Sequence, residues 1–433
     1  MTNICYQGKI YVISYICSVF YDYFDGVIQM EKWISLEQVM AYEEATQAEL
    51  QMAMENCIKQ VINNMPEFEE HFPDANSEGN FYTPGGNPYR IDDWTSGFWT
   101  GEVWLAYENA TDEAVKEQLK TAGNKQVETY LDRINKKLAV DHHDMGFLYI
   151  PSCVASYKLT GNERAKEAAI KAADQLMTRY QPAGEFIQAW GDMNSPDERR
   201  LIIDCLLNIP LLYWATEITG EQHYRDAAEK HITTALKYIV REDNSTWHTI
   251  FINPDGTFSR GATCQGYKDA SAWARGQSWG VYGTAIAYKN TGRAEYIDFF
   301  KRVSDYFLNH LPDDICPFWD LGFGNGDEAE QPRDSSTAAI VACGFLEMSK
   351  YLPEEEAKFY ISAAKKLIGT LIRNYQVTDP KVSNGQLLHG VYCKSTPFNT
   401  CKNAGVDECV IWGDYYFMEA LTRLLKPDWN IYW

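Results

Sequence analysis

The chain has 433 residues and a formal net charge of −21, with 39 Lys and Arg residues against 60 Asp and Glu residues. Electrostatic binding to nucleic acid needs a basic face, and an anionic membrane surface repels an acidic protein, so the sequence excludes nucleic acid and membrane as partners. Hydrophobic residues at 45% and charged residues at 23% are typical of a folded globular chain and exclude a disordered one.

Residues 1–29 precede the first helical pattern and stand apart from the rest of the chain. Their apolar run, Ile10–Phe20, is too short to span a bilayer, and no small-residue cleavage site follows it. We favour an extension in front of a working start at Met30, and a signal peptide is the alternative. No linker rich in Pro and Ser divides residues 30–433, so we expect a single domain there.

After Met30, apolar residues recur at spacings of three and four, which predicts a helical chain. A short signature, Thr-Gly after an aromatic or polar helix end, recurs in Tyr157–Gly161, Thr216–Gly220 and Tyr288–Gly292. Glycine readily takes the left-handed conformation that closes a helix, so each copy marks the turn of a helical hairpin. The pattern predicts helices over residues 36–63, 97–109, 113–137, 146–160, 162–181, 201–219, 221–241, 276–291, 293–310, 335–351, 354–376 and 411–426.

Every second predicted helix is markedly more apolar, as in residues 201–214 and 337–345. This alternation predicts an inner ring wrapped by an outer ring, an all-α (α/α)6 barrel of six helical hairpins. An open solenoid of helix pairs is the alternative. The long connections precede apolar inner helices, so they should emerge together at one end of the ring and hold the functional site. These connections cover residues 64–96, 182–200, 242–274, 311–334 and 377–410.

Polar and aromatic residues at the starts of the inner helices should converge at that end. A single Asp or Ser there is equally explained as a helix N-cap. Asp204 differs, because it lies in the apolar run Leu201–Pro210, where a carboxylate must be paired, desolvated or functional, or else a buried cap. The converging residues are Asp92, Asp93, Trp94, His142, His143, Asp144, Asp204, Arg275, Trp279, Arg333, Asp334, Ser335, Ser336, Trp412 and Asp414.

These residue types suit an acidic sugar. One of two neighbouring carboxyl groups can keep its proton and deliver it, Trp faces stack on a pyranose ring, and an Arg pairs with a sugar carboxylate. Aromatic residues make up 14% of the chain, and an ordinary aromatic core is the alternative for them. A metal site at His142, His143 and Asp144 is disfavoured because adjacent side chains rarely face one ion, and no cofactor motif is present. We therefore predict no metal and no cofactor.

The eleven cysteines are scattered through the sequence. No C-x-x-C pair occurs, so the zinc-ribbon and thioredoxin patterns find no support. Free thiols indicate a reducing compartment, and we expect a cytoplasmic location, with a secretory signal in residues 1–29 as the alternative.

Several short motifs follow one another along the chain: Asp93–Trp99, Asp141–Tyr149, Ile187–Gly191, Ile202–Asn208, Trp273–Gly280, Arg333–Ser336 and Ile411–Tyr416. In this order they resemble the unsaturated glucuronyl hydrolases, glycoside hydrolase family 88, over about residues 36–426. The resemblance implies an (α/α)6 barrel. It also implies removal of the 4,5-unsaturated uronic acid from the non-reducing end of lyase-generated glycosaminoglycan oligosaccharides, through hydration of the C4=C5 double bond.

The resemblance also implies roles for individual residues. Asp204 would be the general acid and base that protonates C4 and assists the addition of water at C5, and Asp144 would be its partner carboxylate. One hairpin repeat separates them, so they can face each other across adjacent inner helices. The implied substrate contacts are Trp94, His143, Trp190, His248, Gln265, Arg275, Trp279 and Tyr392.

Two features depart from the family pattern. Cys264 precedes Gln265, at a place where relatives carry a basic residue or His that helps to select sulfated substrates. The stretch Gly390–Lys402 is longer than the unsulfated-substrate branch leads one to expect. Lys394, Ser395 and Lys402 could form a sulfate pocket there, and a solvated polar loop is the alternative.

Three other functions remain open on the sequence. They are an unsaturated rhamnogalacturonyl hydrolase acting on pectin-derived disaccharides, a non-catalytic carbohydrate-binding barrel, and a helical scaffold that binds other proteins. A buried Asp204 disfavours the scaffold. It also predicts a raised pKa, since burial and the charge of Asp144 outweigh the effect of a helix N-terminus. As partners we expect the unsaturated oligosaccharide and, for the assembly, a monomer or homodimer.

Overall fold

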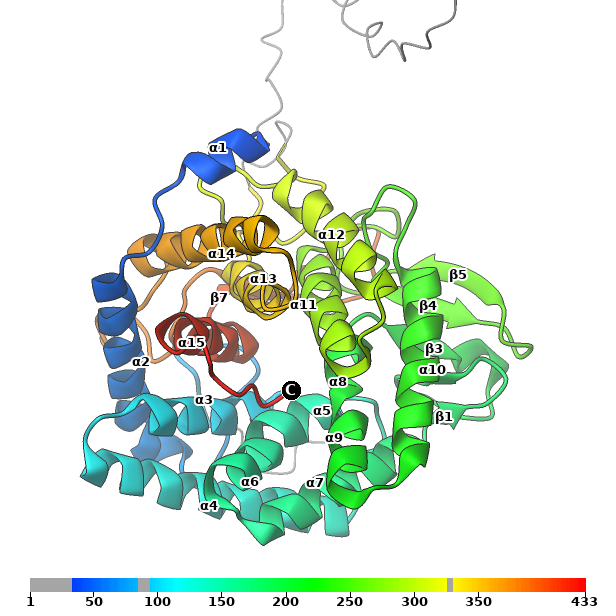
Figure 1. The fold of residues 1–433 in the computed structure, drawn as a ribbon, viewed down its shortest axis with the longest axis horizontal. Helices are drawn as coiled ribbons and strands as arrows, with labels where there is room; N and C mark the ends of the chain where they lie inside the picture. The colour runs from blue at the N-terminus through cyan, green and yellow to red at the C-terminus, as the bar shows by residue number, and fades with distance from the viewer. Residues whose placement is uncertain (1–32, 85–93, 325–329) are drawn as a thin grey trace, which may run out of the picture.

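The computed structural model describes residues 33–84, 94–324 and 330–433. Inner and outer helices alternate six times across these residues and surround a common axis, as seen in Figure 1. The predicted (α/α)6 barrel is confirmed. The proposed start at Met30 and the candidates Asp92 and Asp93 lie outside the described residues. In the part of the chain that is described, no helix combines the length and apolar character that crossing a bilayer requires.

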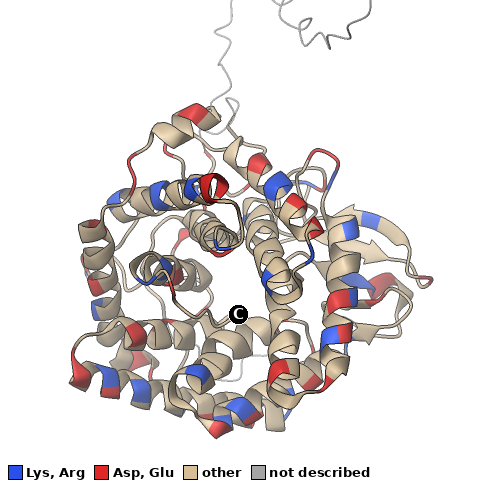
Figure 2. Ribbon diagram, in the orientation of Figure 1, with Lys and Arg blue, Asp and Glu red and all other residues tan. Residues whose placement is uncertain are grey.

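The outer ring consists of amphipathic helices. In the third of them, buried Ala165, Ala168, Ala169, Ala172 and Ala173 form one stripe, as expected for a helix that packs on one face. Figure 2 shows that the Lys, Arg, Asp and Glu residues gather on the outer helices, while the inner ones are mostly uncharged. The outer helices are α2 (Gln47–Phe68), α4 (Glu113–Asn135), α7 (Glu163–Met177), α10 (Gln222–Ile239), α12 (Glu295–Leu308) and α14 (Glu354–Asn374).

The inner ring consists of helices that are buried nearly all round. Every residue of α13 (Ser335–Met348) is buried, which explains why the inner helices read as apolar runs. The second inner helix contains a π-helical segment that begins next to Pro151, a residue that lacks a backbone donor. The other inner segments are α3 (Ser96–Asn109), α5 (Met145–Tyr149) with η1 (Ile150–Val154) and α6 (Ala155–Thr160), α8 (Cys205–Asn208) with α9 (Pro210–Thr219), α11 (Ala274–Thr291) and α15 (Ile411–Leu425).

The ring closes on itself. Neighbouring inner helices contact one another in chain order, and α15 packs against both α2 and α3. A solenoid would leave these first and last elements apart, so the open alternative is wrong. Closure brings the starts of all six inner helices to one end of the barrel.

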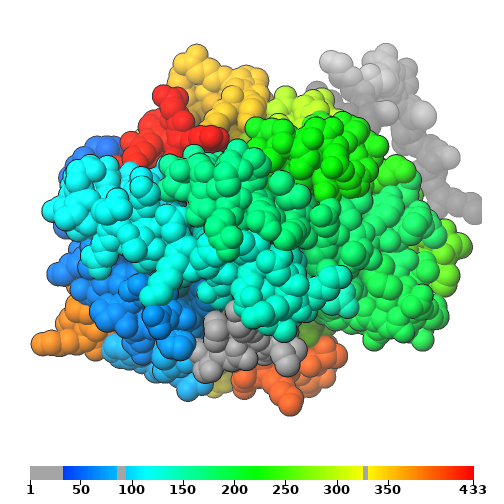
Figure 3. Space-filling model, turned by 90° about the horizontal axis from the view of Figure 1, so that it is seen from below, coloured from blue at the N-terminus to red at the C-terminus, as the bar shows by residue number. Residues whose placement is uncertain are grey.

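The residues that follow α15 turn back into the centre of the ring (Figure 1). The Trp433 ring stacks on Tyr416 with centroids 5.9 Å apart, and its Nε1 donates to Glu419 at 2.8 Å. Lys158 and Lys289, near the C-terminal ends of α6 and α11, donate to backbone carbonyls of this tail. The tail therefore fills the centre of the barrel at the end opposite the long connections. The side view in Figure 3 agrees, with red C-terminal residues at the upper edge and the orange-red segment near residue 400 at the lower edge.

The long connections contain all the strands in the described part of the chain. They form the hairpin β1 (Tyr180–Gln181) with β2 (Phe186–Ile187), an antiparallel sheet in the order β3 (Arg200–Ile202), β4 (Thr249–Ile252), β5 (Phe258–Ala262), and the hairpin β6 (Gly390–Cys393) with β7 (Ala404–Glu408). Their place at one end of the barrel matches the predicted location of the site. A 3-10 turn, η2 (Pro196–Glu198), lies in the same region.

Three predicted helix boundaries are wrong. The helix predicted over 36–63 is split into α1 (Leu36–Ala41) and α2, because Thr46 adopts an extended conformation and forms a capping box with Glu49. The helix predicted from residue 201 begins only at Cys205, because residues 200–202 pair with β4 instead. Helix α7 ends at Met177 rather than at 181, since the chain there enters β1.

Gly146 allows α5 to approach α8 closely. A Cβ atom at this position would lie 2.3 Å from the Cα and 2.5 Å from the carbonyl oxygen of Asn208. Backbone atoms cannot rotate away as a side chain can, so we expect Gly146→Ala to push α5 and α8 apart. The expected loss in the free energy of unfolding is about 1–3 kcal/mol. The midpoint of urea denaturation measures this. Gly280→Ala is the control, since its nearest contact would be the Thr246 side chain at 3.3 Å, and an equal loss in both variants would contradict the argument.

Candidate active site

A cavity of about 500 Å³ opens at the end of the barrel where the long connections gather. The starts of four inner helices and residues of the long connections, among them parts of β3 and β6, contribute to its wall. Nine of the residues proposed from the sequence as catalytic or substrate-contacting line it. The complete lining is Trp94, Asp141, His142, Asp144, Trp190, Ile202, Asp204, His248, Cys264, Gln265, Trp273, Arg275, Trp279, Tyr392 and Cys393.

Two carboxyl groups face each other in the cavity. Asp144 directly precedes α5 and Asp204 directly precedes α8, and these two helices are in contact. The His143 side chain lies between them, with its Nε2 3.4 Å from Asp144 Oδ1 and 3.5 Å from Asp204 Oδ1. An oxygen of each carboxyl group lies within 4.8 Å of the other. The predicted pairing across adjacent inner helices is therefore present in the geometry.

The two carboxyl groups have opposite electrostatic environments. Burial raises the pKa of Asp204 well above its ordinary value, and the charge of Asp144 adds to the rise, while Arg275 opposes it. Within the described residues, Asp204 Oδ1 is buried without a hydrogen-bond partner and its side chain does not cap α8, so the buried-cap interpretation is wrong. This shift favours the protonated form of Asp204, which is the form that a general acid requires.

Asp144 remains ionised because its neighbours favour the carboxylate. Burial works against the charge, but His143, His142 and Asn208 outweigh it, so the pKa of Asp144 lies below its ordinary value. His142 Nδ1 lies 3.1 Å from Asp144 Oδ2, and Asn208 Nδ2 donates to Asp144 Oδ1 at 3.2 Å. The sequence analysis did not single out Asn208. Its place one helical turn after Asp204 was the available signal, since that spacing puts both on one helix face.

Two buried histidines of the site, His143 and His248, are neutral at neutral pH. Burial lowers the pKa of His143 to about 4, and burial together with the charge of Arg275 lowers that of His248 to about 3. The backbone N–H groups of Cys264 and Gln265 lie 3.0 and 3.3 Å from His248 Nδ1. Nδ1 therefore accepts, and the proton resides on Nε2, where it can be donated to a ligand.

Arg275 and the aromatic residues around it form one wall of the cavity. The guanidinium lies between the rings of Trp273 and Trp412, 4.5 and 4.6 Å from their centroids. Its Nη2 donates to the carbonyl oxygen of Tyr392 at 2.7 Å. The Tyr392 hydroxyl accepts from Trp94 Nε1 at 3.0 Å. The wall therefore presents aromatic faces and one buried cation.

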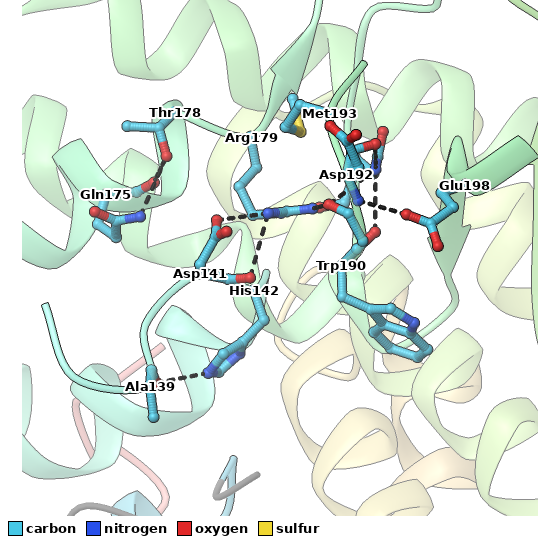
Figure 4. Close-up of polar contacts among 12 residues, drawn as sticks. Ala139, Asp141, His142, Gln175, Thr178, Arg179, Trp190, Asp192, Met193 and Glu198 are labelled. Atoms are coloured by element: carbon cyan, nitrogen blue, oxygen red, sulfur yellow. Dashed lines mark hydrogen bonds and ion pairs between the residues drawn. The ribbon is translucent and has the colours of Figure 1, made fainter. Parts of the chain in front are cut away.

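Trp190 stands at the opposite side with an exposed ring, 41% of its surface being accessible. Figure 4 shows how its loop is held: buried Arg179 donates to Asp141 and to the carbonyl oxygen of Gly191, so one side chain joins the loop before α5 to the loop of Trp190. The Trp190 ring meets His143 edge-on at 6.0 Å. An exposed, anchored indole beside the carboxyl pair is suited to stacking on a sugar ring.

The remaining predicted contacts lie elsewhere. His143 is buried between the two carboxyl groups and is not part of the cavity lining. Lys394 donates to the backbone of Glu330 at 3.2 Å, and the Ser395 N–H donates to Asn403, outside the lining. The sulfate pocket at Lys394 and Ser395 thus stays a prediction. The lining residues that the sequence analysis did not propose as contacts are Asp141, His142, Ile202, Cys264, Trp273 and Cys393.

His143, Asp144 and Asp204 are the one group of three potential metal ligands, within the described ranges, whose ligand atoms all lie within 4.8 Å of one another. Spacing alone would admit a cation. A cation bound there would have to displace the proton that Asp204 favours, because a carboxyl group binds a metal in its deprotonated form.

Comparison with known proteins agrees with the motifs. The model of Glycosyl Hydrolase Family 88 matches residues 67–425. An unsaturated chondroitin disaccharide hydrolase of Streptococcus pneumoniae is 45% identical over 409 residues, covering 94% of this chain and 99% of the relative. The crystal structure of an unsaturated glucuronyl hydrolase from Streptococcus agalactiae superposes with a TM-score of 0.85 at 43% identity, covering 94% of this chain and 99% of that chain.

A mutant of the Streptococcus agalactiae enzyme has been crystallised in complex with dGlcA-GalNAc6S, and its structure matches with a TM-score of 0.79 at 40% identity, covering 94% of this chain and 99% of that chain. These matches cover nearly the whole chain rather than a fragment of it. They show that the chain belongs to glycoside hydrolase family 88, the unsaturated glucuronyl hydrolases.

Proposed function

We propose that this chain hydrates the C4=C5 double bond of the unsaturated uronic acid at the non-reducing end of chondroitin-type disaccharides. Asp204 acts as general acid and then base, and Asp144 acts as its ionised partner. The observation that carries the proposal is the contrast between two facing carboxyl groups, one holding its proton and one ionised, in a cavity with an exposed indole.

The geometry supports a proton transfer to carbon. Asp204 gives its proton to C4, and the positive charge that develops at C5 is shared with the ring oxygen. A water molecule adds to C5 while the Asp204 carboxylate takes up one of its protons, so the residue ends as it began. The resulting hemiketal opens, the next sugar leaves, and a keto-uronate remains.

Other side chains would orient the sugar for this step. The Trp190 ring is placed to stack on a pyranose, and His248 Nε2–H is available as a donor to the uronate. The ionised Asp144 accepts hydrogen bonds from sugar hydroxyl groups and, through its charge, keeps Asp204 protonated. Trp94, Gln265, Arg275, Trp279 and Tyr392 complete the proposed substrate contacts.

The substrate class is supported by the relatives. The Streptococcus pneumoniae relative is named for unsaturated chondroitin disaccharides, and the Streptococcus agalactiae structure holds dGlcA-GalNAc6S. The pectin-derived alternative has no such support. The non-catalytic barrel is disfavoured by the intact pair of Asp144 and Asp204.

The test is the ultraviolet absorbance of the conjugated double bond in unsaturated disaccharides from chondroitin, hyaluronan and heparin digests. Loss of absorbance with the chondroitin products fastest is the expected result. No loss with any of the three, from a folded protein, would disprove the proposal. The ranking of sulfated against unsulfated disaccharides, repeated with Lys394→Ala and Ser395→Ala, tests the contribution of the β6–β7 hairpin to sulfate binding.

The pH dependence of this activity should depend on Asp144. Activity requires protonated Asp204, so it falls as the pH rises through the Asp204 pKa. The Asp144 charge raises that pKa, so in Asp144→Asn the alkaline limb of the residual kcat/KM should move to lower pH, by about one unit. Asp141→Asn is the control, because this carboxylate is paired with Arg179. An unmoved limb in Asp144→Asn would contradict the assigned electrostatic role.

We further propose that residues 30–433 form one catalytic domain working as a monomer or homodimer in the cytoplasm. Nine described cysteines are free thiols, six of them buried, which supports a reducing compartment. Size-exclusion chromatography with light scattering tests the assembly.

A further inference from the structure

Asp334 is a buried carboxylate that takes no part in the cavity lining and yet connects several residues of its wall. It is fully buried at the start of α13. Its Oδ2 accepts from Arg275 Nη1 at 3.2 Å, and its Oδ1 accepts from the Ser336 hydroxyl at 2.6 Å and the Val391 N–H at 3.4 Å. All three partners are donors, which is the environment of an ionised carboxylate.

Each of these contacts leads to the cavity wall. Arg275, held by Asp334, donates onward to the carbonyl oxygens of Val391 and Tyr392 in β6. Ser336, the second partner, accepts from Trp412 Nε1 at 3.1 Å. Through these two branches a single carboxylate holds both the cation of the wall and the aromatic ring beside it.

The Trp412 branch reaches the substrate side. The Trp412 ring stacks on Trp94 at 5.1 Å with an interplanar angle of 24°, and Trp94 donates to the Tyr392 hydroxyl. Trp94 and Tyr392 line the cavity, and Trp412 backs them. The two branches from Asp334 thus meet again at Tyr392.

Helix capping does not explain Asp334. Asp334 precedes α13, and its position in the sequence is explained equally well by a helix N-cap. Within the described residues, however, its side chain makes no capping hydrogen bond. Its carboxylate accepts instead from the Ser336 side chain in the first turn of α13, from Arg275 in α11 and from the β6 backbone. Keeping a charged carboxylate buried costs desolvation free energy, and no capping hydrogen bond offsets that cost. The buried charge of Asp334 therefore points to a role in the site.

We propose that Asp334 is a positioning residue of the hydration reaction: it fixes Arg275, β6 and Trp412 as one wall and offsets the Arg275 charge at Asp204. The proposal rests on the function assigned to Asp204 above. Asp334 itself touches no substrate.

The electrostatic part follows from the sign of the charges. Arg275 lowers the pKa of Asp204, and a compensating negative charge on Arg275 weakens that effect. Burial raises the pKa of Asp334, while Arg275, Ser336 and Val391 favour its charged form. The other titratable groups that face Asp204 or Arg275 are His143, Asp144, Cys205, His248, Tyr392, Cys393 and Tyr416.

Asp334→Asn provides the test. An amide at this position is uncharged and replaces one of the two acceptor oxygens by a donor. The Arg275 charge is then uncompensated, and the bonds to Arg275 or those to Ser336 and Val391 are disturbed. We expect the alkaline limb of kcat/KM, measured on the unsaturated chondroitin disaccharide, to move to lower pH by about half a unit or more. KM should rise about tenfold because the wall is no longer fixed.

A matched control separates this role from general damage to the barrel. Asp320 is another fully buried aspartate, but it accepts from Ser271 and from the backbone of Tyr267 and Gly322. Asp320→Asn should lower thermal stability and leave the limb of the pH profile in place. The double variant Asp334→Asn with Arg275→Met should restore the limb to its wild-type pH, since the uncompensated cation is gone.

The outcomes are distinct. An unmoved limb in Asp334→Asn, or an equal shift in Asp320→Asn, overturns the inference while wild-type activity upholds the proposed function. A wild-type protein without activity overturns both. If Asp334→Asn does not fold, Ser336→Ala is the second variant, because it removes only the contact that leads to Trp412. It should raise KM without moving the alkaline limb of the pH profile. An unchanged KM in Ser336→Ala would refute the role of Asp334 in fixing the cavity wall.

Discussion

Replacing Asp204 by Asn is expected to lower kcat about 10²- to 10⁴-fold, the range that a positioned general acid contributes. The amide keeps the size of the side chain and carries no proton that can be transferred to C4. Substrate affinity should stay near that of wild type, because the substitution leaves the proposed contacts with Trp190 and His248 in place. The decline of the double-bond absorbance under single-turnover conditions measures the loss, and equilibrium binding of the disaccharide measures the affinity.

Asp192→Asn is the control for this loss. Asp192 belongs to the loop of Trp190 but lies outside the cavity lining, and its carboxylate accepts from the backbone of Asn194. Activity within about twofold of wild type is expected there, as for a surface substitution away from the chemistry. If Asp204→Asn retained more than about a tenth of wild-type kcat, the acid would have to be another group.

The largest effect on stability is expected for Arg423→Leu. The Arg423 guanidinium is buried and donates to Glu347 at 2.7 Å, to Glu419 at 3.0 Å and to the Tyr282 hydroxyl at 2.6 Å. Burial opposes the charge of Glu347, yet Arg423 and Lys350 hold its pKa at about 2. Removing Arg423 leaves buried Glu419 without its paired cation and Glu347 with Lys350 alone, which costs about 3–5 kcal/mol.

Denaturant unfolding followed by tryptophan fluorescence measures this loss. Arg164→Leu is the matched control, because Arg164 pairs with Glu128 on the exposed surface of the outer ring, with both side chains about half accessible. That pair should contribute less than about 1 kcal/mol. Equal losses for the two arginines would show that burial of the network does not determine its strength.

The barrel was predictable because its signals are local and repeated. A glycine at three of the hairpin turns and the switch between amphipathic and apolar helices are visible without tertiary information. Gly161 and Gly220, for example, both adopt positive φ. The strand at residues 200–202 was not predictable, since Leu201 and Ile202 pair with β4, which lies more than 40 residues away along the chain. Apolar β-branched runs fit either a strand or a buried helix, and only the partner decides.

The carboxyl pair was predictable for a different reason. Asp204 is conspicuous in its apolar run, and Asp144 lies one repeat before it. The partners that set their properties are less visible: Asn208 is an ordinary polar residue in sequence, and Asp334 looks like a cap. Their roles depend on which donors the fold brings to them, as Arg275 is brought to Asp334 from another helix. Residue type and the family motifs point to the proposed reacting groups, whereas only the folded structure shows the groups that support them.

Closure of the ring between α15 and the α2–α3 pair imposes an order on biosynthesis. While the ribosome extends the chain, the apolar face of α3 lacks its neighbour on one side until Ile411–Leu425 has emerged. The nascent chain is until then an open arc with exposed inner faces, the kind of intermediate that chaperones bind. The same helix carries Trp412, so the wall of the cavity is completed in the step that closes the barrel. Translation that stops before α15 would yield an arc prone to aggregation and without any partial activity.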